Sequence, residues 1–356
     1  MENRQRRYTL TLWLAILLSL TLTWSGVGVA GSLEVHFLDV GQAEATLLRG
    51  QDFTILIDAG DRGSYDVVHH LARLGVKKID LLIFTHPHAD HIGQGVAVLE
   101  NFLVEEVWMS GYEHTTKLYE DLLDAILASG AFYHEPRRGQ HADLDFTFGD
   151  LSLEILHPDK LSSDLHHTNI VIRAIYGDVA FMFTGDAERK TENSILASGV
   201  PVQAQIFQLG HHGSRTSSGI EFVVAVNPQV AIYSAGVKND YGHPHPEVVE
   251  RMIRLGMDLY GTDVNGTVVV YTDGSDYRVE VTKNGGQLQV GGVDLNSATF
   301  VDLQRIVHIG PERAREIIAL RAIKAFKSLD DLRRVSGLGD KRIREIKEQG
   351  IAYVKE

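Results

Sequence analysis

A histidine-rich string at residues 84–95 limits what this chain can fold into more than any other segment. It comes directly after the apolar run of residues 79–84, which predicts a buried β-strand with these side chains at its carboxyl end. Four metal-capable side chains fall within six residues, namely His86, His88, Asp90 and His91. Imidazole nitrogen and carboxylate oxygen bind zinc, manganese or iron, and a set with few soft ligands favours a hydrolytic metal over a redox one. The alternative, a polar loop in which histidines gather by chance, is disfavoured.

The lack of cysteine narrows the chemistry further. The 356 residues include no thiol, so a metal site can use only nitrogen and oxygen ligands, and no disulfide framework can form. This length accommodates one large domain and one small domain.

Three later segments add candidate ligands directly after predicted strands. A strand at 179–183 ends in Thr-Gly-Asp, and a strand at 203–209 leads into His-His-Gly-Ser. After a strand at 230–234 comes a Tyr-Gly-His-Pro-His turn, which its two prolines make rigid. These segments contribute Asp186, His211, His212, His243 and His245.

The His-x-His-x-Asp-His string resembles the signature of the metallo-β-lactamase superfamily. The Asp-Val-Gly-Gln opening at 39–42 and the His-His-Gly-Ser string narrow this resemblance to the domain of that type in ComEC, the DNA-uptake channel protein of competent bacteria. The resemblance implies an α/β fold, an αββα metallo-β-lactamase sandwich with one or two metals at the sheet edge. One departure is Ala43-Glu44, where that family usually has Gly-Asp.

The same resemblance implies roles for the candidate residues. It assigns His86 and His88 to one divalent ion, Zn or Mn, and Asp90 and His91 to a second, with Asp186 bridging both. His166 and His167 stand where a further ligand for the first ion is expected, so that either one binds this ion or both face the substrate, and one of His211 and His212 completes the second. His243 and His245 overhang the metals as candidate general acids, and Asp90 shares ligand and proton-handling duties.

The first thirty residues have the pattern of an export signal. Three arginines precede an almost uncharged run of about 17 residues, which ends in small residues and a plausible cleavage point after Ala30. This pattern predicts a secreted or extracytoplasmic protein, with membrane anchoring through an uncleaved N-terminus as the alternative.

The C-terminal part has a different composition and predicts a small all-α domain at residues 293–354. Residues 294–356 contain 13 Lys and Arg against 10 Asp and Glu, although the whole chain has a net charge of −13. Two helix–turn–helix units resemble the tandem helix-hairpin-helix domain of ComEA, a DNA receptor. Its turns imply phosphate contacts through Gly310, Gly337, Gly339, Lys341 and Arg342. His308 stands where the first turn glycine is expected, in the left-handed region, so the second hairpin is the better clamp.

Together these observations predict an exported protein made of four segments. Residues 1–30 form a signal or anchor, 32–284 the hydrolase domain, 285–292 a linker and 293–354 the DNA-binding domain. The predicted function is a monomeric two-metal nuclease or phosphodiesterase acting on single- or double-stranded DNA without sequence specificity. Two alternatives remain open. One is a different hydrolase of the same fold, acting on a lactam, a lactone or a phosphorylcholine ester, and the other is a DNA-uptake receptor with an accessory metal domain.

Overall fold

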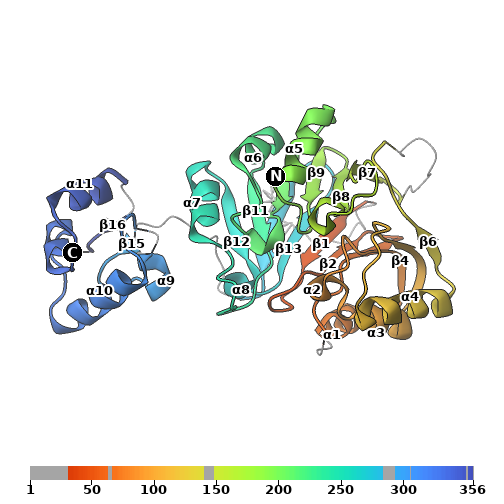
Figure 1. The fold of residues 1–356 in the computed structure, drawn as a ribbon, viewed down its shortest axis with the longest axis horizontal. Coiled ribbons are helices and arrows are strands. Elements are labelled where there is room, and N and C mark those ends of the chain that lie inside the picture. Colours follow the sequence, from red (N-terminus) through yellow and green to blue (C-terminus); the bar gives the residue numbers. More distant parts are fainter. Residues whose placement is uncertain are drawn as a thin grey trace, which may run out of the picture. The chain divides into compact units, whose positions relative to one another are not determined.

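Two β-sheets packed face to face form the centre of the larger part of the chain (Figure 1). The computed structural model describes residues 31–62, 66–139, 148–283, 293–304, 306–349 and 352–355. The first sheet has eight strands in the order β14-β13-β1-β2-β3-β4-β5-β6, and the second has six in the order β12-β11-β10-β9-β8-β7. Strands β3 to β6 run parallel to one another, as do strands β9 to β12.

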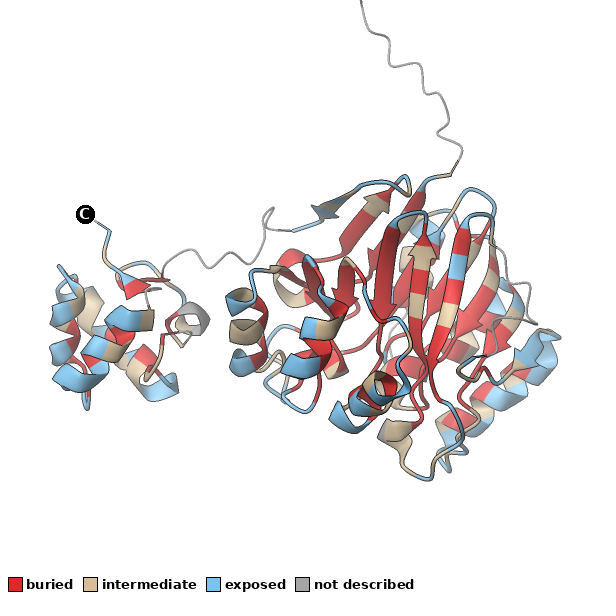
Figure 2. Cartoon of the chain, turned by 90° about the horizontal axis from the view of Figure 1, so that it is seen from above, coloured by how far each residue is buried: buried red, intermediate tan, exposed pale blue. Residues whose placement is uncertain are grey.

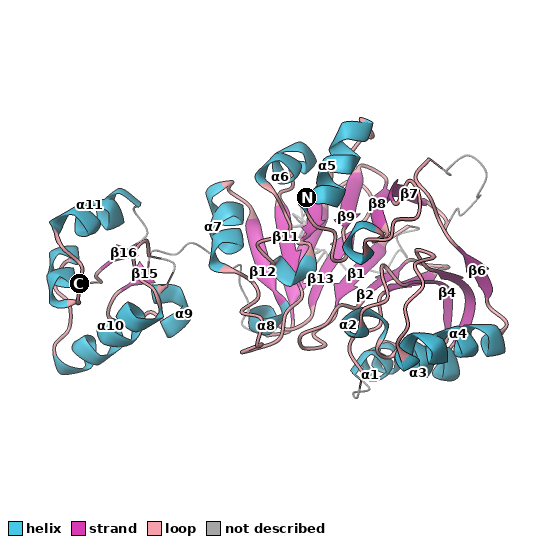
Figure 3. Cartoon of the chain, viewed as in Figure 1, coloured by secondary structure: helices cyan, strands magenta, loops and turns pink. Residues whose placement is uncertain are grey.

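The strands and helices alternate along the chain (Figure 3). The strands of the first sheet are β1 (Leu33–Phe37), β2 (Thr46–Arg49), β3 (Thr54–Ile57), β4 (Lys78–Ile83), β5 (Leu103–Trp108), β6 (Phe132–His134), β13 (Val268–Thr272) and β14 (Tyr277–Val281). Those of the second are β7 (Leu151–His157), β8 (Val171–Tyr176), β9 (Val179–Phe183), β10 (Ile206–Gln208), β11 (Val230–Tyr233) and β12 (Asp258–Gly261). The helices are α1 (Asp66–Arg73), α2 (Ala89–Ile92), α3 (Gly95–Asn101), α4 (Lys117–Ser129), α5 (Arg189–Ser198), α6 (Ile220–Val226), α7 (Pro246–Arg254) and α8 (Thr262–Asn265), with short 3₁₀ turns η2 (Leu165–His167) and η3 (His211–Gly213).

Side-chain alternation along the strands builds a four-layer sandwich. In β4, Leu81 and Ile83 point into the core between the sheets, while Leu82 joins the core under α1, α3 and α4. In the second sheet Phe181 faces the inner core, and Met182 packs with α5, α6 and α7 on the outer face. Both sheets are therefore buried on two sides (Figure 2), as parallel sheets require. The predicted αββα sandwich is confirmed.

This arrangement decides where polar side chains can gather. Strands β4, β9, β10 and β11 all end at the same edge of the sandwich, and each is followed by one of the loops singled out in the sequence. Ligand sites in open α/β sheets form outside the carboxyl ends of parallel strands. Loops from both sheets therefore meet at this edge.

The C-terminal module has a hydrophobic core of its own, built from residues between Val293 and Ala352. Its elements are β15 (Val293–Asp294), α9 (Phe300–Leu303), α10 (Pro311–Ile323), the 3₁₀ turn η4 (Leu329–Arg334), α11 (Asp340–Gln349) and β16 (Ala352–Tyr353). The expectation of helices alone was incomplete, because β15 and β16 pair in parallel and join the two ends of the module. Within this module, η4 is a 3₁₀ turn and not an α-helix.

Several expectations fall outside what the structure describes. They are the export signal at 1–30 and the linker at 285–292. The placing of the domain boundaries therefore stays a prediction. Within the described parts of the chain, no helix is both long enough and apolar enough to span a membrane.

Candidate metal centre

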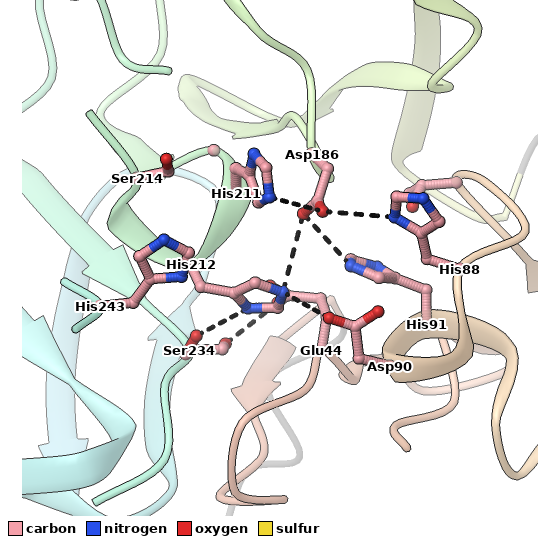
Figure 4. Close-up of polar contacts among 12 residues, drawn as sticks. Glu44, His88, Asp90, His91, Asp186, His211, His212, Ser214, Ser234 and His243 are labelled. Carbon is pink, nitrogen blue, oxygen red and sulfur yellow. Dashed lines mark hydrogen bonds and ion pairs between the residues drawn. The ribbon is translucent and has the colours of Figure 1, made fainter. Parts of the chain in front are cut away.

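A buried carboxylate, Asp186, lies at the centre of a ring of histidines at this edge (Figure 4). It follows β9, and its backbone N–H donates to the side-chain oxygen of Asn169 over 3.0 Å. Among the described residues, five histidines bring a ring nitrogen within 4.0 Å of its carboxylate oxygens. These are His91 at 3.2 Å, His86 and His211 at 3.5 Å, His212 at 3.7 Å and His88 at 4.0 Å. Loops from both sheets thus supply one cluster.

Hydrogen bonds fix the tautomers of the three most buried rings. Nδ1 of His212 lies 2.9 Å from the backbone carbonyl of Ser234, which can only accept, so this nitrogen carries the proton. Nδ1 of His91 lies 2.7 Å from the Asp58 carboxylate and donates in the same way. When each ring is neutral, its Nε2 atom therefore carries a lone pair that faces Asp186.

The third ring, His86, is oriented through a hydroxyl. Thr85 Oγ1 donates to Asp58 over 2.7 Å, so its oxygen is free to accept from Nδ1 of His86 at 3.2 Å. Asp58 also accepts from the Thr85 backbone N–H over 2.8 Å, and it is fully buried. One carboxylate below the cluster therefore orients both His86 and His91.

The donor set requires a positive charge at its centre. Nε2 of His91 and Oδ1 of Asp186 are buried without a hydrogen-bond partner, and they face each other at 3.2 Å. Two lone pairs at this distance repel unless a cation or a proton lies between them. Within the part of the chain that the structure describes, two groups bring their donor atoms within 4.8 Å of one another: His86, His91 and Asp186, and Asp90, His91 and His212. Nitrogen and oxygen donors in this number suit divalent zinc or manganese, so the residues fit a metal site.

The pKa values of the clustered groups also indicate that the site favours a positive charge. Burial alone would raise the pKa of Asp186, but His91, His212 and His86 hold it well below its usual value. Burial would lower the pKa of His212, yet Asp186 and Asp90 raise it to about 9. For His86 the largest effect is burial, which lowers its pKa to about 3. The carboxylates therefore stay ionised and attract whichever cation is available.

An open pocket leads from solvent to this cluster. Its volume is about 310 Å³, and its lining consists of Gln42, His88, Ala89, Asp90, Asp186, His211, His212, Tyr241 and His243. Asp90 lies 3.2 Å from Nε2 of His212. His245, predicted as a general acid alongside His243, is not part of this lining, and its Nδ1 accepts from the backbone N–H of Arg215 instead.

The further ligand that the sequence predicted at His166 or His167 is not found in the cluster among the residues whose side chains the structure describes. The structure does not describe the side chain of His166. Nδ1 of its neighbour His167 lies 2.8 Å from the Thr191 hydroxyl, and the His167 ring centroid lies 4.9 Å from that of the buried His157 at an interplanar angle of 39°. Neither His167 nor His157 belongs to the two metal-capable groups. The metal roles assigned from the sequence stay predictions, although the structure brings seven of the eight residues together.

Two buried carboxyl groups near the cluster had no assigned role. Asp58 directly follows β3 and belongs to none of the segments singled out in the sequence. Glu44 lies under the cluster, where Ser234 Oγ donates to it over 3.0 Å and burial raises its pKa to about 7. Its side chain is 1% exposed. An acidic residue placed directly after a buried strand was the one signal that could have marked Asp58.

The two turns of the C-terminal module share a backbone conformation but differ in the residue that adopts it. His308 has a φ of 67°, as predicted, and its Nε2 lies 2.5 Å from Glu345. Gly337, at the equivalent position of the second turn, has a φ of 75°. Arg342 donates to the carbonyl of Gly337 over 2.7 Å.

A basic side chain also connects the two turns. Arg313 donates to the carbonyl of His308 over 2.7 Å and to that of Ser336 over 3.0 Å. With Arg342 and the exposed Lys341, it places positive charge beside the second turn. The second hairpin therefore has both the open glycine turn and the cations.

Comparison with known proteins decides the family. Residues 38–237 match the metallo-beta-lactamase superfamily, and residues 289–349 match the helix-hairpin-helix motif. This chain belongs to the metallo-beta-lactamase superfamily. The resemblance inferred from the His-x-His-x-Asp-His string is confirmed, together with the helical C-terminal module.

Relatives of this superfamily member include proteins named for competence. ComE operon protein 3 of Bacillus subtilis (strain 168) is 30% identical over 66% of this chain and 32% of its own length. Competence protein ComA of Neisseria gonorrhoeae is 31% identical, over 65% of this chain and 31% of its own length. ComE operon protein 1 of Bacillus subtilis (strain 168) is 35% identical over 23% of this chain and 43% of its own length. The chain thus spans about a third of the length of the first two.

Proposed function

We propose that this chain is a two-metal phosphodiesterase that cleaves DNA and holds the strand through its helix-hairpin-helix module. The observation that carries the proposal is the convergence of three histidine lone pairs on Asp186, beside Asp90, in a pocket open to solvent. This hydrolytic donor set occurs in the same chain as a helix-hairpin-helix motif. Competence-named relatives favour DNA over lactams, lactones or choline esters.

Two divalent ions, Zn or Mn, would supply Lewis acidity toward a phosphoryl oxygen and lower the pKa of a water molecule to roughly 7. The residues placed to hold them are His86, His88, Asp90, His91, Asp186, His211 and His212. Asp186 faces both groups and is the candidate bridge. Asp58, Thr85 and the Ser234 carbonyl hold the Nδ1 atoms of these histidines, so their Nε2 atoms are already turned toward Asp186.

His243 is positioned to hydrogen-bond a substrate oxygen from above. The Gln42 amide nitrogen lies 3.5 Å from its Nδ1, which favours the tautomer with the proton on Nε2. Burial, together with His212, His211 and His245, lowers its pKa to about 4, so the ring is neutral near pH 7. We therefore assign His243 the donation of a hydrogen bond from neutral imidazole to the substrate. Asp90 remains the candidate for holding a proton near the attacking water.

The C-terminal module is proposed to hold the phosphate backbone without reading bases. The Gly337 turn leads into α11, whose first turn carries Lys341 and Arg342. Free N–H groups at a helix start and nearby cations suit phosphate oxygens and carry no sequence information. Residues 1–30 are proposed to direct export, in line with their basic, apolar and small-residue order.

A substrate panel with metal-loaded full-length protein tests the proposal. Single-stranded DNA, duplex DNA, bis-p-nitrophenyl phosphate, nitrocefin and a lactone are each incubated with protein in Mn²⁺ or Zn²⁺. We expect DNA to be cleaved and the His86→Ala variant to lose at least 100-fold in rate. The exposed histidine of α1 gives a matched control, since His69→Ala should retain full activity.

Each alternative has its own result in this panel. Turnover of nitrocefin or the lactone above that of any phosphodiester would replace the proposal with another hydrolase. If no substrate is cleaved and His86→Ala still binds DNA as tightly as the wild type, the chain is a DNA receptor with an accessory metal domain.

A further inference from the structure

An exposed aromatic side chain forms part of the pocket wall. Tyr241 is 68% exposed and lines the same pocket as Asp90, Asp186 and His212. A tyrosine this exposed gains little from packing within its own chain, because most of its apolar surface still meets water. Because Tyr241 lies beside the candidate catalytic cluster, a substrate bound at that cluster can contact its exposed ring.

Three rings lead from the cluster to this tyrosine. His243 lies 6.1 Å from His212 with an interplanar angle of 23°, and Tyr241 lies 5.7 Å from His243 at 21°. The rings are thus nearly parallel, and Tyr241 is the outermost of the three. A flat group bound beside the metal-capable cluster would meet the open side of the Tyr241 ring as the next layer of this stack.

The turn that carries Tyr241 is braced from within. The Asn239 side chain donates to the carbonyls of Gly236 and His243 over 2.9 and 2.5 Å, and it accepts from the His243 N–H over 3.0 Å. Gln42 ties the start of the turn to the first sheet by accepting from the Gly236 N–H over 3.0 Å. The ring is therefore presented in place before a ligand arrives, which lowers the entropy cost of binding.

We propose that Tyr241 is a stacking platform for an unpaired nucleobase next to the phosphodiester held at the metal centre. This inference rests on the proposed phosphodiesterase function and gives it a substrate preference, single-stranded over double-stranded DNA. Every base has a π-face, so a single aromatic platform binds bases without sequence preference. In a duplex those faces are already covered by neighbouring base pairs, and the platform cannot be used.

Single-turnover cleavage by the full-length, metal-loaded protein tests this platform. One strand carries 2-aminopurine beside the cleaved bond, and a second carries an abasic site there. On the first strand, Tyr241→Ala should lose roughly tenfold in kcat/KM, the typical effect of removing one stacking ring. On the abasic strand it should match the wild type. Tyr241→Phe should behave as wild type on both strands, and Tyr133→Ala, which removes an exposed tyrosine of β6, is the matched control.

The fluorescence of 2-aminopurine gives a readout independent of cleavage. Stacking quenches it, so the wild type and Tyr241→Phe should quench, and Tyr241→Ala should not. An equal loss by Tyr241→Ala on the normal and abasic strands would mean that the ring only supports His243, and would overturn the platform. If the wild type cleaves no phosphodiester, the proposed function fails, and the quenching alone then tests whether Tyr241 stacks on a base. Quenching that depends on Tyr241 supports the stacking platform, and quenching that does not depend on Tyr241 overturns it.

Discussion

Replacing Asp58 by asparagine should disable the metal centre without touching a metal-capable atom. Oδ1 of Asp58 accepts from the Thr85 backbone N–H, and Oδ2 accepts from both the Thr85 hydroxyl and Nδ1 of His91. Asparagine must keep its oxygen toward the backbone N–H, so its NH₂ group replaces Oδ2. The Thr85 hydroxyl and the Nδ1–H of His91 are both donors, and they then face an NH₂ group that is also a donor. The protons of Thr85 and His91 therefore have to move.

The consequence follows for both histidines. Nδ1 of His91 must become an acceptor, which moves its proton to Nε2, and the Thr85 hydroxyl turns its hydrogen toward Nδ1 of His86 with the same result. Both rings then present N–H groups to Asp186 in place of lone pairs. Loss of a hydrogen bond that orients a metal ligand typically weakens metal binding 10- to 100-fold, so with two ligands affected we expect at least about 100-fold. Exchanging two hydrogen bonds to a charged carboxylate for two neutral ones should lower stability by about 2 kcal/mol, or roughly 4–8 °C in Tm.

Competition with a chromophoric zinc chelator measures the affinity, and long-range ¹⁵N–¹H imidazole spectra report the tautomers. Asp80→Asn is the matched control, because Asp80 braces the same sheet through the Thr54 N–H and has no bond to the cluster. A folded Asp58→Asn protein that binds zinc within twofold of the wild type would refute the reasoning.

Three further predictions test other parts of the molecule. Gly337→Val should weaken DNA retention at least tenfold and leave turnover of bis-p-nitrophenyl phosphate unchanged. The reason is that a φ of 75° strains a β-branched residue, whose Cβ would lie 2.9 Å from Arg313. Equal DNA affinity of the variant and the wild type in a gel-shift titration would contradict this prediction. Phe207→Ala should cost about 3–5 kcal/mol in urea unfolding, since this ring is fully buried against Phe222, whereas the 78% exposed Phe132→Ala should cost below about 0.5 kcal/mol. Removing metal with EDTA should lower the unfolding free energy by about 2.7 kcal/mol relative to protein in Mn²⁺ at 100 times its Kd, and an unchanged Tm would argue against a metal in the folded state.

The sequence predicted the strands that carry the cluster because their patterns are unambiguous. Apolar runs such as residues 79–84 predict buried strands. The family resemblance implied that Asp186 and one of His211 and His212 lie near His91, and the structure explains this because their strands end at one edge of the sandwich. Short elements were missed because they lack such a pattern. β6 and β12 are three and four residues long and carry too little periodicity to be distinguished from loops.

The orientation of the ligands could not be predicted from the sequence. The partners that set the tautomers of His86, His91 and His212 are a threonine, a carboxylate after another strand, and the backbone carbonyl of Ser234. None of these has a recognisable motif, and a backbone carbonyl exists at every residue. The unequal roles of His243 and His245 likewise depend on which ring the Gln42 amide and the Arg215 N–H reach in three dimensions.

The division of the donor set between the two sheets has a practical consequence. His86, His88, Asp90 and His91 come from the first sheet, and Asp186, His211 and His212 come from the second. A molecule whose halves have not docked can offer only part of the set and should bind metal weakly. The stoichiometry of tightly bound metal in a preparation therefore counts its correctly assembled molecules, and can serve as a quality measure before any substrate is known.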